Sequence, residues 1–124
     1  MRTIKEWSTE IHELAKSKGW YDKERSPLEL HMLIVSEVAE ATEEARKDAL
    51  PIYVFNPVIR QDVGPTDAGW VDGLKPKGEL IELADAVIRV MDYCESRGWD
   101  LEQAIQIKHE YNETRPHRHG GKLY

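Results

Sequence analysis

Apolar residues recur every three or four positions in four stretches of the chain, which is the spacing of amphipathic helices. Ser26, Pro27 and Glu29 form a helix start, with a capping box and proline at the first helical position. Gly19 and Gly98 follow two of the stretches and mark helix ends. Four helices with no clear sheet predict an all-α, four-helix bundle-like fold. The predicted helices run from about Thr3 to Ser17, Ser26 to Asp48, Lys77 to Ser96 and Asp100 to Thr114.

The segment between the second and third predicted helices has a different pattern. Prolines and glycines interrupt any helix in residues 50–76. The apolar runs 52–55 and 58–59 suit a short strand or a packed loop. A loop of this length in a small domain is usually either functional or disordered, and the apolar content favours order. We therefore predict a long ordered loop here.

Acidic residues replace apolar ones on the core-facing side of the second predicted helix. The stripe advances by three and four residues and turns acidic halfway along the helix. Its members are Leu30, Leu33, Glu37, Glu40 and Glu44. The third predicted helix is apolar around most of its circumference, which is typical of a buried helix. It carries one polar stripe, made of Glu82, Asp85, Arg89 and Asp92.

Two acidic pairs, Glu37 with Glu40 and Glu82 with Asp85, are therefore predicted on inward faces. Facing carboxylates repel and raise each other's pKa, and a divalent cation relieves this repulsion. Oxygen ligands without a Cys or His cluster favour Mg²⁺, with Mn²⁺ as an alternative. A ferritin-like di-iron site needs Glu-x-x-His, which the chain lacks. The competing interpretation is a set of salt bridges with arginines, for which Arg89 and Arg46 are the candidates.

The fourth predicted helix ends in cationic and amide residues. Its stripe passes from apolar residues to Lys108, Asn112 and Arg115, and Lys122 follows two glycines beyond it. Lysine and arginine suit phosphate oxygens, and glycines let backbone N–H groups approach them. A frayed basic helix end, favoured by the helix dipole, is the simpler interpretation. For stacking on a nucleotide base, the candidates outside predicted helices are Trp20 and Trp70.

Composition limits the class of protein further. The 124 residues predict a single domain, 1–124. The net charge of −6 argues against binding nucleic acid by bulk electrostatics. We expect no membrane span, because no apolar run approaches about 18 residues. With one cysteine and no signal-peptide pattern at the N-terminus, a cytoplasmic protein is expected. The chain has no P-loop motif.

Three ordered motifs resemble those of MazG-like nucleoside triphosphate pyrophosphohydrolases. Residues 36–40 (SEVAE) and 82–85 (ELAD) resemble the ExxE…ExxD signature, and 108–122 resembles the end of small MazG-like proteins. The resemblance covers about residues 26–122. This chain departs from some relatives at Ser36, where they have a second glutamate, and in the length of 50–76.

The resemblance implies an all-α MazG fold and Mg²⁺-dependent cleavage of an NTP or dNTP to a monophosphate and pyrophosphate, in nucleotide-pool house-cleaning. Glu37, Glu40, Glu82 and Asp85 would hold the metal and form the catalytic set. Lys108, Asn112, Arg115 and Lys122 would contact phosphate. The apolar circumference of the third helix and the resemblance both predict a homodimer or homotetramer. The alternatives are a non-catalytic helical module that binds a metal or a partner, and a nucleotide-binding regulator.

Overall fold

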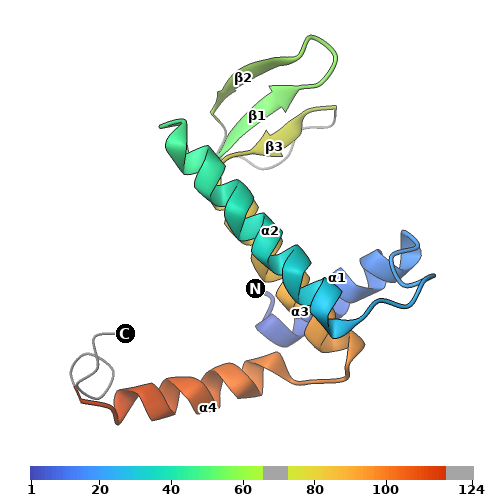
Figure 1. The fold of residues 1–124 in the computed structure, drawn as a ribbon, viewed down its shortest axis with the longest axis vertical. Helices are drawn as coiled ribbons and strands as arrows, with labels where there is room; N and C mark the ends of the chain where they lie inside the picture. The colour runs from blue at the N-terminus through green and yellow to red at the C-terminus, as the bar shows by residue number, and fades with distance from the viewer. Residues whose placement is uncertain (66–72, 117–124) are drawn as a thin grey trace. The chain divides into compact units, whose positions relative to one another are not determined.

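The computed structural model describes residues 1–65 and 73–116, and these group into two compact units (Figure 1). One unit combines Met1–Asp22 with the chain from Met91, and the other is Lys23–Val90. The third helix, α3 (Glu79–Ser96), continues from one unit into the other. In the part of the chain that is described, no helix is long and apolar enough to cross a membrane.

The unit Lys23–Val90 contains α2 (Pro27–Arg46), a small sheet and the first part of α3. The N-cap of α2 is Ser26, whose side chain accepts a hydrogen bond from the backbone of Glu29. Three short strands follow: β1 (Tyr53–Asn56), β2 (Gln61–Pro65) and β3 (Lys75–Lys77). They pair antiparallel in the order β2-β1-β3.

A glycine joins the sheet to α3. Gly78 has a φ of 123°, a backbone conformation that residues with a side chain rarely adopt. A Cβ atom at this position would also collide with the carbonyl oxygen of Pro51. That same carbonyl accepts a hydrogen bond from the backbone N–H of Leu80, at 3.1 Å. The close approach ties the start of α3 to the segment after α2. It therefore fixes the position of the first turn of α3, which carries Glu82.

The other unit contains α1 (Ile4–Ser17), the end of α3 and α4 (Leu101–Glu113). A buried polar network joins α1 and the following turn to α3. Asp92 is 8% exposed; its carboxylate accepts a hydrogen bond from Tyr21 Oη at 2.8 Å and lies 2.8 Å from His12 Nδ1. Asp92, which the sequence places on the polar stripe of α3, is therefore used to hold α1 in place.

The four predicted helices are present in the described residues, within one or two residues of their predicted ends. The fold is mostly helical, but residues 53–77 contain a sheet that the predicted all-α fold does not include. The sequence allows one short strand in this segment. Three short strands form because the apolar residues of β1 lie between two partners and Tyr53 and Val54 become buried.

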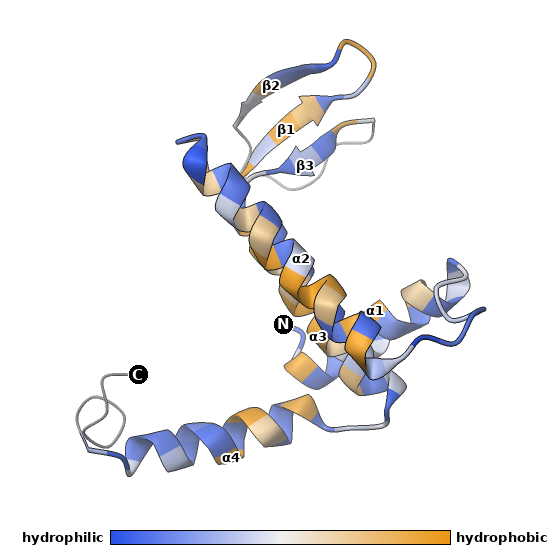
Figure 2. Ribbon diagram, in the orientation of Figure 1, coloured by the Kyte–Doolittle hydropathy of each residue, from blue (hydrophilic) through white to orange (hydrophobic). Residues whose placement is uncertain are grey.

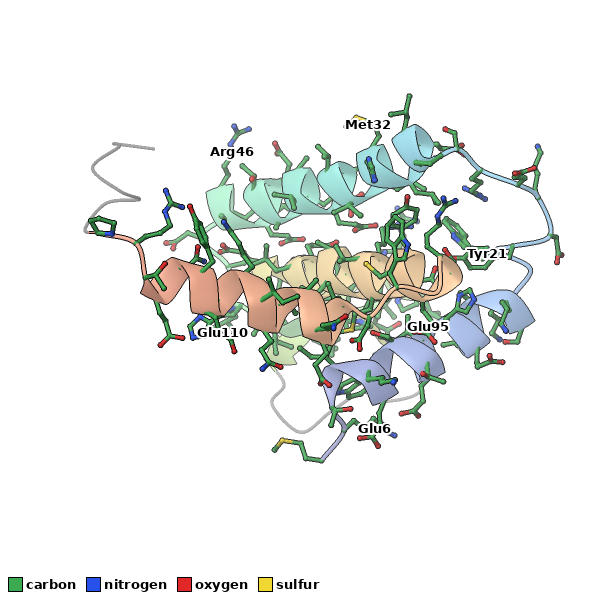
Figure 3. The ribbon with its side chains drawn as sticks, turned by 90° about the horizontal axis from the view of Figure 1, so that it is seen from below. Glu6, Tyr21, Met32, Arg46, Glu95 and Glu110 are labelled. Atoms are coloured by element: carbon green, nitrogen blue, oxygen red, sulfur yellow. The ribbon has the colours of Figure 1, made fainter. Side chains whose placement is uncertain are left out.

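Much of the apolar surface of α2 and α3 stays exposed in the single chain. Figure 2 shows hydrophobic residues on both helices. On α2, Met32 and Val35 are 61% and 53% exposed, and on α3, Val87 is 50% exposed. Figure 3 shows Met32 on the side of α2 that points away from α3. The burial of α3 that the sequence predicts is therefore not reached among the described residues of the single chain.

Candidate metal centre

Three glutamates from α2 and α3 come together in the unit Lys23–Val90. One carboxylate oxygen each from Glu37, Glu40 and Glu82 lies within 4.8 Å of the other two. Glu37 is buried, Glu82 is half-buried and Glu40 is exposed. Because residues three apart lie on one face of a helix, the acidic face of α2 meets that of α3. Three of the four predicted carboxylates thus lie together.

Asp85 lies one helical turn after Glu82 and completes the predicted set of four carboxylates. Burial and the charge of Glu37 raise the pKa of Asp85, while the charges of Arg89 and Lys75 lower it in part. Asp85 therefore experiences the electric field of both α2 glutamates. All four carboxylates predicted from the sequence belong to one compact unit.

Glu82 shows the strongest effect of this crowding. Burial, a hydrogen bond to Glu40 and the negative charges around it raise the pKa of Glu82 to about 7. The negative charges of Glu40, Asp85 and Glu37 all contribute to this rise in the pKa of Glu82. The carboxylates of Glu82 and Glu40 can lie at hydrogen-bond distance only when a proton or a cation lies between them. The donor set is made of oxygens alone and carries excess negative charge, so these residues fit Mg²⁺ or Mn²⁺.

The arginine interpretation is correct for one of the two candidate arginines. Arg89 Nε donates a hydrogen bond to Glu37 Oε1 at 2.7 Å, and Glu37 has only 9% of its side chain exposed. Arg46 instead pairs with Glu43, outside the cluster. Arg89 therefore pairs with Glu37, and its charge also lowers the pKa of Asp85. Four carboxylates beside these few cations still leave a surplus of negative charge.

Glu44, the next acidic residue on the same face of α2, is bound by protein groups. Tyr53 Oη donates to Glu44 Oε2 at 2.8 Å, and Lys47 Nζ donates to Glu44 Oε1 at 3.4 Å. Burial, followed by this contact with Glu44, raises the pKa of Tyr53 to about 12. Tyr53 is not among the residues that the sequence motifs indicate, and its only signal in the sequence is an aromatic residue shortly after an acidic helix. Glu44 is thus bound to Tyr53 of the sheet and is not one of the clustered glutamates.

The candidate phosphate residues belong to the other compact unit. Lys108 and Asn112 lie on α4, and Arg115 follows its C-cap. Lys108 Nζ and the Arg115 guanidinium lie 4.8 and 5.6 Å from the centroid of the Tyr111 ring. The structure therefore brings two predicted cations together around one aromatic side chain.

Three candidate residues remain, namely Trp20, Trp70 and Lys122. Trp20 is half-buried in the turn after α1. Lys122 and Trp70 lie outside the described residues.

Comparison with protein-family models, with curated proteins and with solved structures finds no match for this chain.

The raised pKa of Glu82 predicts how stability depends on pH when no metal is bound. The folded protein holds this proton more tightly than the unfolded chain, in which the pKa is near 4.5. The contribution of Glu82 to stability is thus present below pH 4.5 and is lost as the pH rises to about 7. With saturating Mn²⁺ this loss should disappear, since metal ligands bind in their deprotonated form.

Thermal unfolding across this pH range, with EDTA and with Mn²⁺, measures the effect. The Glu82→Gln variant in EDTA serves as the control, because it cannot take up this proton. If wild type and Glu82→Gln lose stability equally as the pH rises, the crowding of Glu82 has no energetic consequence and this prediction is wrong.

Proposed function

We propose that this chain is a Mg²⁺-dependent nucleoside triphosphate pyrophosphohydrolase that converts an NTP or dNTP to the monophosphate and pyrophosphate. The observation that carries the proposal is the oxygen-only cluster of Glu37, Glu40 and Glu82, with Asp85 beside it. The resemblance of the motifs around these four residues to the MazG-like ExxE…ExxD signature supports the same reaction. As the cellular role of this reaction we propose nucleotide-pool house-cleaning.

The four carboxylates would hold Mg²⁺, or Mn²⁺ in its place. Once bound, the cation supplies positive charge to phosphate oxygens and lowers the pKa of a bound water. Arg89 orients Glu37 through their hydrogen bond, which leaves the second oxygen of that carboxylate for a ligand role. Glu40 is our candidate base, because its carboxylate is the exposed member of the cluster and shares a hydrogen bond with Glu82.

Residues of α4 and beyond would contact the phosphates, as the resemblance implies. They are Lys108, Asn112, Arg115 and Lys122. Lysine and arginine side chains form charge-assisted hydrogen bonds to phosphate oxygens. Trp20 and Trp70 remain the candidates for stacking on the base.

We expect pyrophosphate release from at least one member of a panel of NTPs and dNTPs with Mg²⁺, and none when EDTA replaces the metal. A coupled assay for pyrophosphate, checked by separating the monophosphate product, measures the reaction. Glu82→Gln protein purified in parallel controls for contaminating hydrolases. If the whole panel releases no pyrophosphate at high protein concentration, the chain is not this enzyme.

A non-catalytic metal-binding module is the second candidate, and one observation favours it. The ion pair between Arg89 and Glu37 balances part of the cluster without any metal. A protein that binds Mn²⁺ and a nucleotide but releases no product from the panel would have this function. The panel, together with titrations of Mn²⁺ and nucleotide into the protein, thus distinguishes the two candidates.

We also propose that the protein is a homodimer or homotetramer. No large side chain is fully buried among the described residues, and the exposed apolar residues of α2 and α3 recur along both helices. Aliphatic residues gathered on a helix face are typical of an interface rather than of solvent-facing surface. A second copy, related by a two-fold axis, would offer the same apolar faces in return.

A further inference from the structure

One face of the small sheet combines aromatic and cationic side chains. Tyr53 and Phe55 are alternate residues of β1, so they share a face. In the antiparallel pairing with β3, Tyr53 is opposite Lys77 and Phe55 is opposite Lys75. Directly opposite residues of such a pair lie on the same side of the sheet. All four side chains therefore belong to one face.

This sheet face is turned toward the acidic ends of α2 and α3. Tyr53 reaches α2, where its hydroxyl donates to the buried carboxylate of Glu44. The negative charge of Glu82 also acts on Tyr53. In addition, β3 leads through Gly78 directly into the first turn of α3, which carries Glu82. The face that carries Lys75 thus lies beside the carboxylate cluster, within the same compact unit.

The two lysines of β3 have different surroundings. Lys77 is half-buried, and its Nζ lies 4.7 Å from the centroid of the Phe55 ring and 5.8 Å from that of Tyr53. Lys75 is exposed, and within residues 1–65 and 73–116 no hydrogen bond or ion pair engages its ammonium group. Its positive charge nevertheless acts on Asp85. Lys77 thus lies against aromatic rings, whereas Lys75 is an exposed cation on the same sheet face, and its charge lowers the pKa of Asp85.

We propose that Lys75 binds the polyphosphate group of the substrate beside the acidic cluster. The inference rests on the proposed function, because a cation held by Glu37, Glu40, Glu82 and Asp85 is what draws a polyphosphate to this face. Without a cation, the four carboxylates repel phosphate. A bound cation would attract phosphate oxygens to the cluster, and a lysine on the neighbouring sheet face would supply a flexible point charge and three hydrogen-bond donors. Lys75 is a phosphate contact that the sequence motifs do not indicate.

The test compares Lys75→Ala, Lys75→Arg and Lys77→Ala with wild type in two titrations. Inorganic tripolyphosphate is titrated into protein saturated with Mn²⁺, and Mn²⁺ alone is titrated into metal-free protein. We expect Lys75→Ala to weaken tripolyphosphate binding about tenfold, as for loss of a charged hydrogen bond. Lys75→Arg should restore most of the affinity. Lys77→Ala, which removes the same charge two residues away, should change it little.

The Mn²⁺ titration separates phosphate binding from a purely structural role of Lys75. Removing a positive charge beside the carboxylates should leave Mn²⁺ binding unchanged or tighter, so weaker tripolyphosphate binding with intact Mn²⁺ binding supports the inference. Equal tripolyphosphate affinity in Lys75→Ala and wild type overturns the inference alone. If wild-type protein binds neither Mn²⁺ nor tripolyphosphate, the proposed function fails as well.

Discussion

Replacing Glu82 by glutamine is expected to lower Mg²⁺-dependent turnover by about 1,000-fold while the metal-free protein stays folded. The carboxamide removes one ligand charge, and stabilisation of phosphate charge by a bound cation amounts to several kcal/mol. The same change removes the carboxylate whose pKa burial and Glu40 raise to about 7. Since repulsion within the cluster falls, the metal-free variant should be as stable as wild type above neutral pH, or more stable.

Glu79→Gln is the matched control for this substitution. Glu79 lies one turn earlier on α3, is exposed and undergoes the same chemical change outside the cluster. Pyrophosphate release gives the turnover, and thermal unfolding in EDTA gives the stability. Turnover close to wild type in Glu82→Gln would show that Glu82 is not a ligand. Unfolding of Glu82→Gln with intact Glu79→Gln would instead show that the carboxylate has a structural role.

Val35→Asp is expected to split the proposed oligomer. Val35 lies on the outward face of α2 with Met32, and both side chains are more than half exposed in the single chain. If a second copy covers this face, the substitution places an unpaired carboxylate in an apolar interface, which costs several kcal/mol for each copy. Light scattering should then change from a multiple of 14.3 kDa toward 14.3 kDa itself.

Val58→Asp provides the control for this effect. Val58 lies in the turn between β1 and β2 rather than on a helix, is 86% exposed and undergoes the same change from valine to aspartate. We expect it to leave the mass unchanged at micromolar concentration. A wild-type protein that is already monomeric and active would contradict the oligomer without affecting the metal centre.

The helices and their ends are predictable because their signals are local. Ser26 and Asp100 each cap a helix by accepting a backbone N–H three residues later. The acidic pairs are predictable for the same reason, since spacings of three place two side chains on one helix face. From residues 37–40 and 82–85 alone, the sequence indicates two carboxylates on each of two inward faces.

The partners of these carboxylates depend on contacts between residues far apart in the chain. Arg89 and Arg46 are equivalent candidates in the sequence, yet Arg89 reaches Glu37 and Arg46 pairs with its neighbour Glu43. The relative register of α2 and α3 decides between them. Local spacing contains no information about that register.

The sequence by itself determined four helices, their caps and the two acidic faces, because each of these depends on residues within a few positions of one another. Only the tertiary structure decided that residues 53–56, 61–65 and 75–77 form a sheet, that Tyr53 binds Glu44 and that the charge of Lys75 lowers the pKa of Asp85. Strand pairing and side-chain contacts between elements depend on how separate segments pack, and the same local pattern is compatible with several such arrangements. The helix spacing therefore predicts which faces are acidic, and the packing determines which charges act on them.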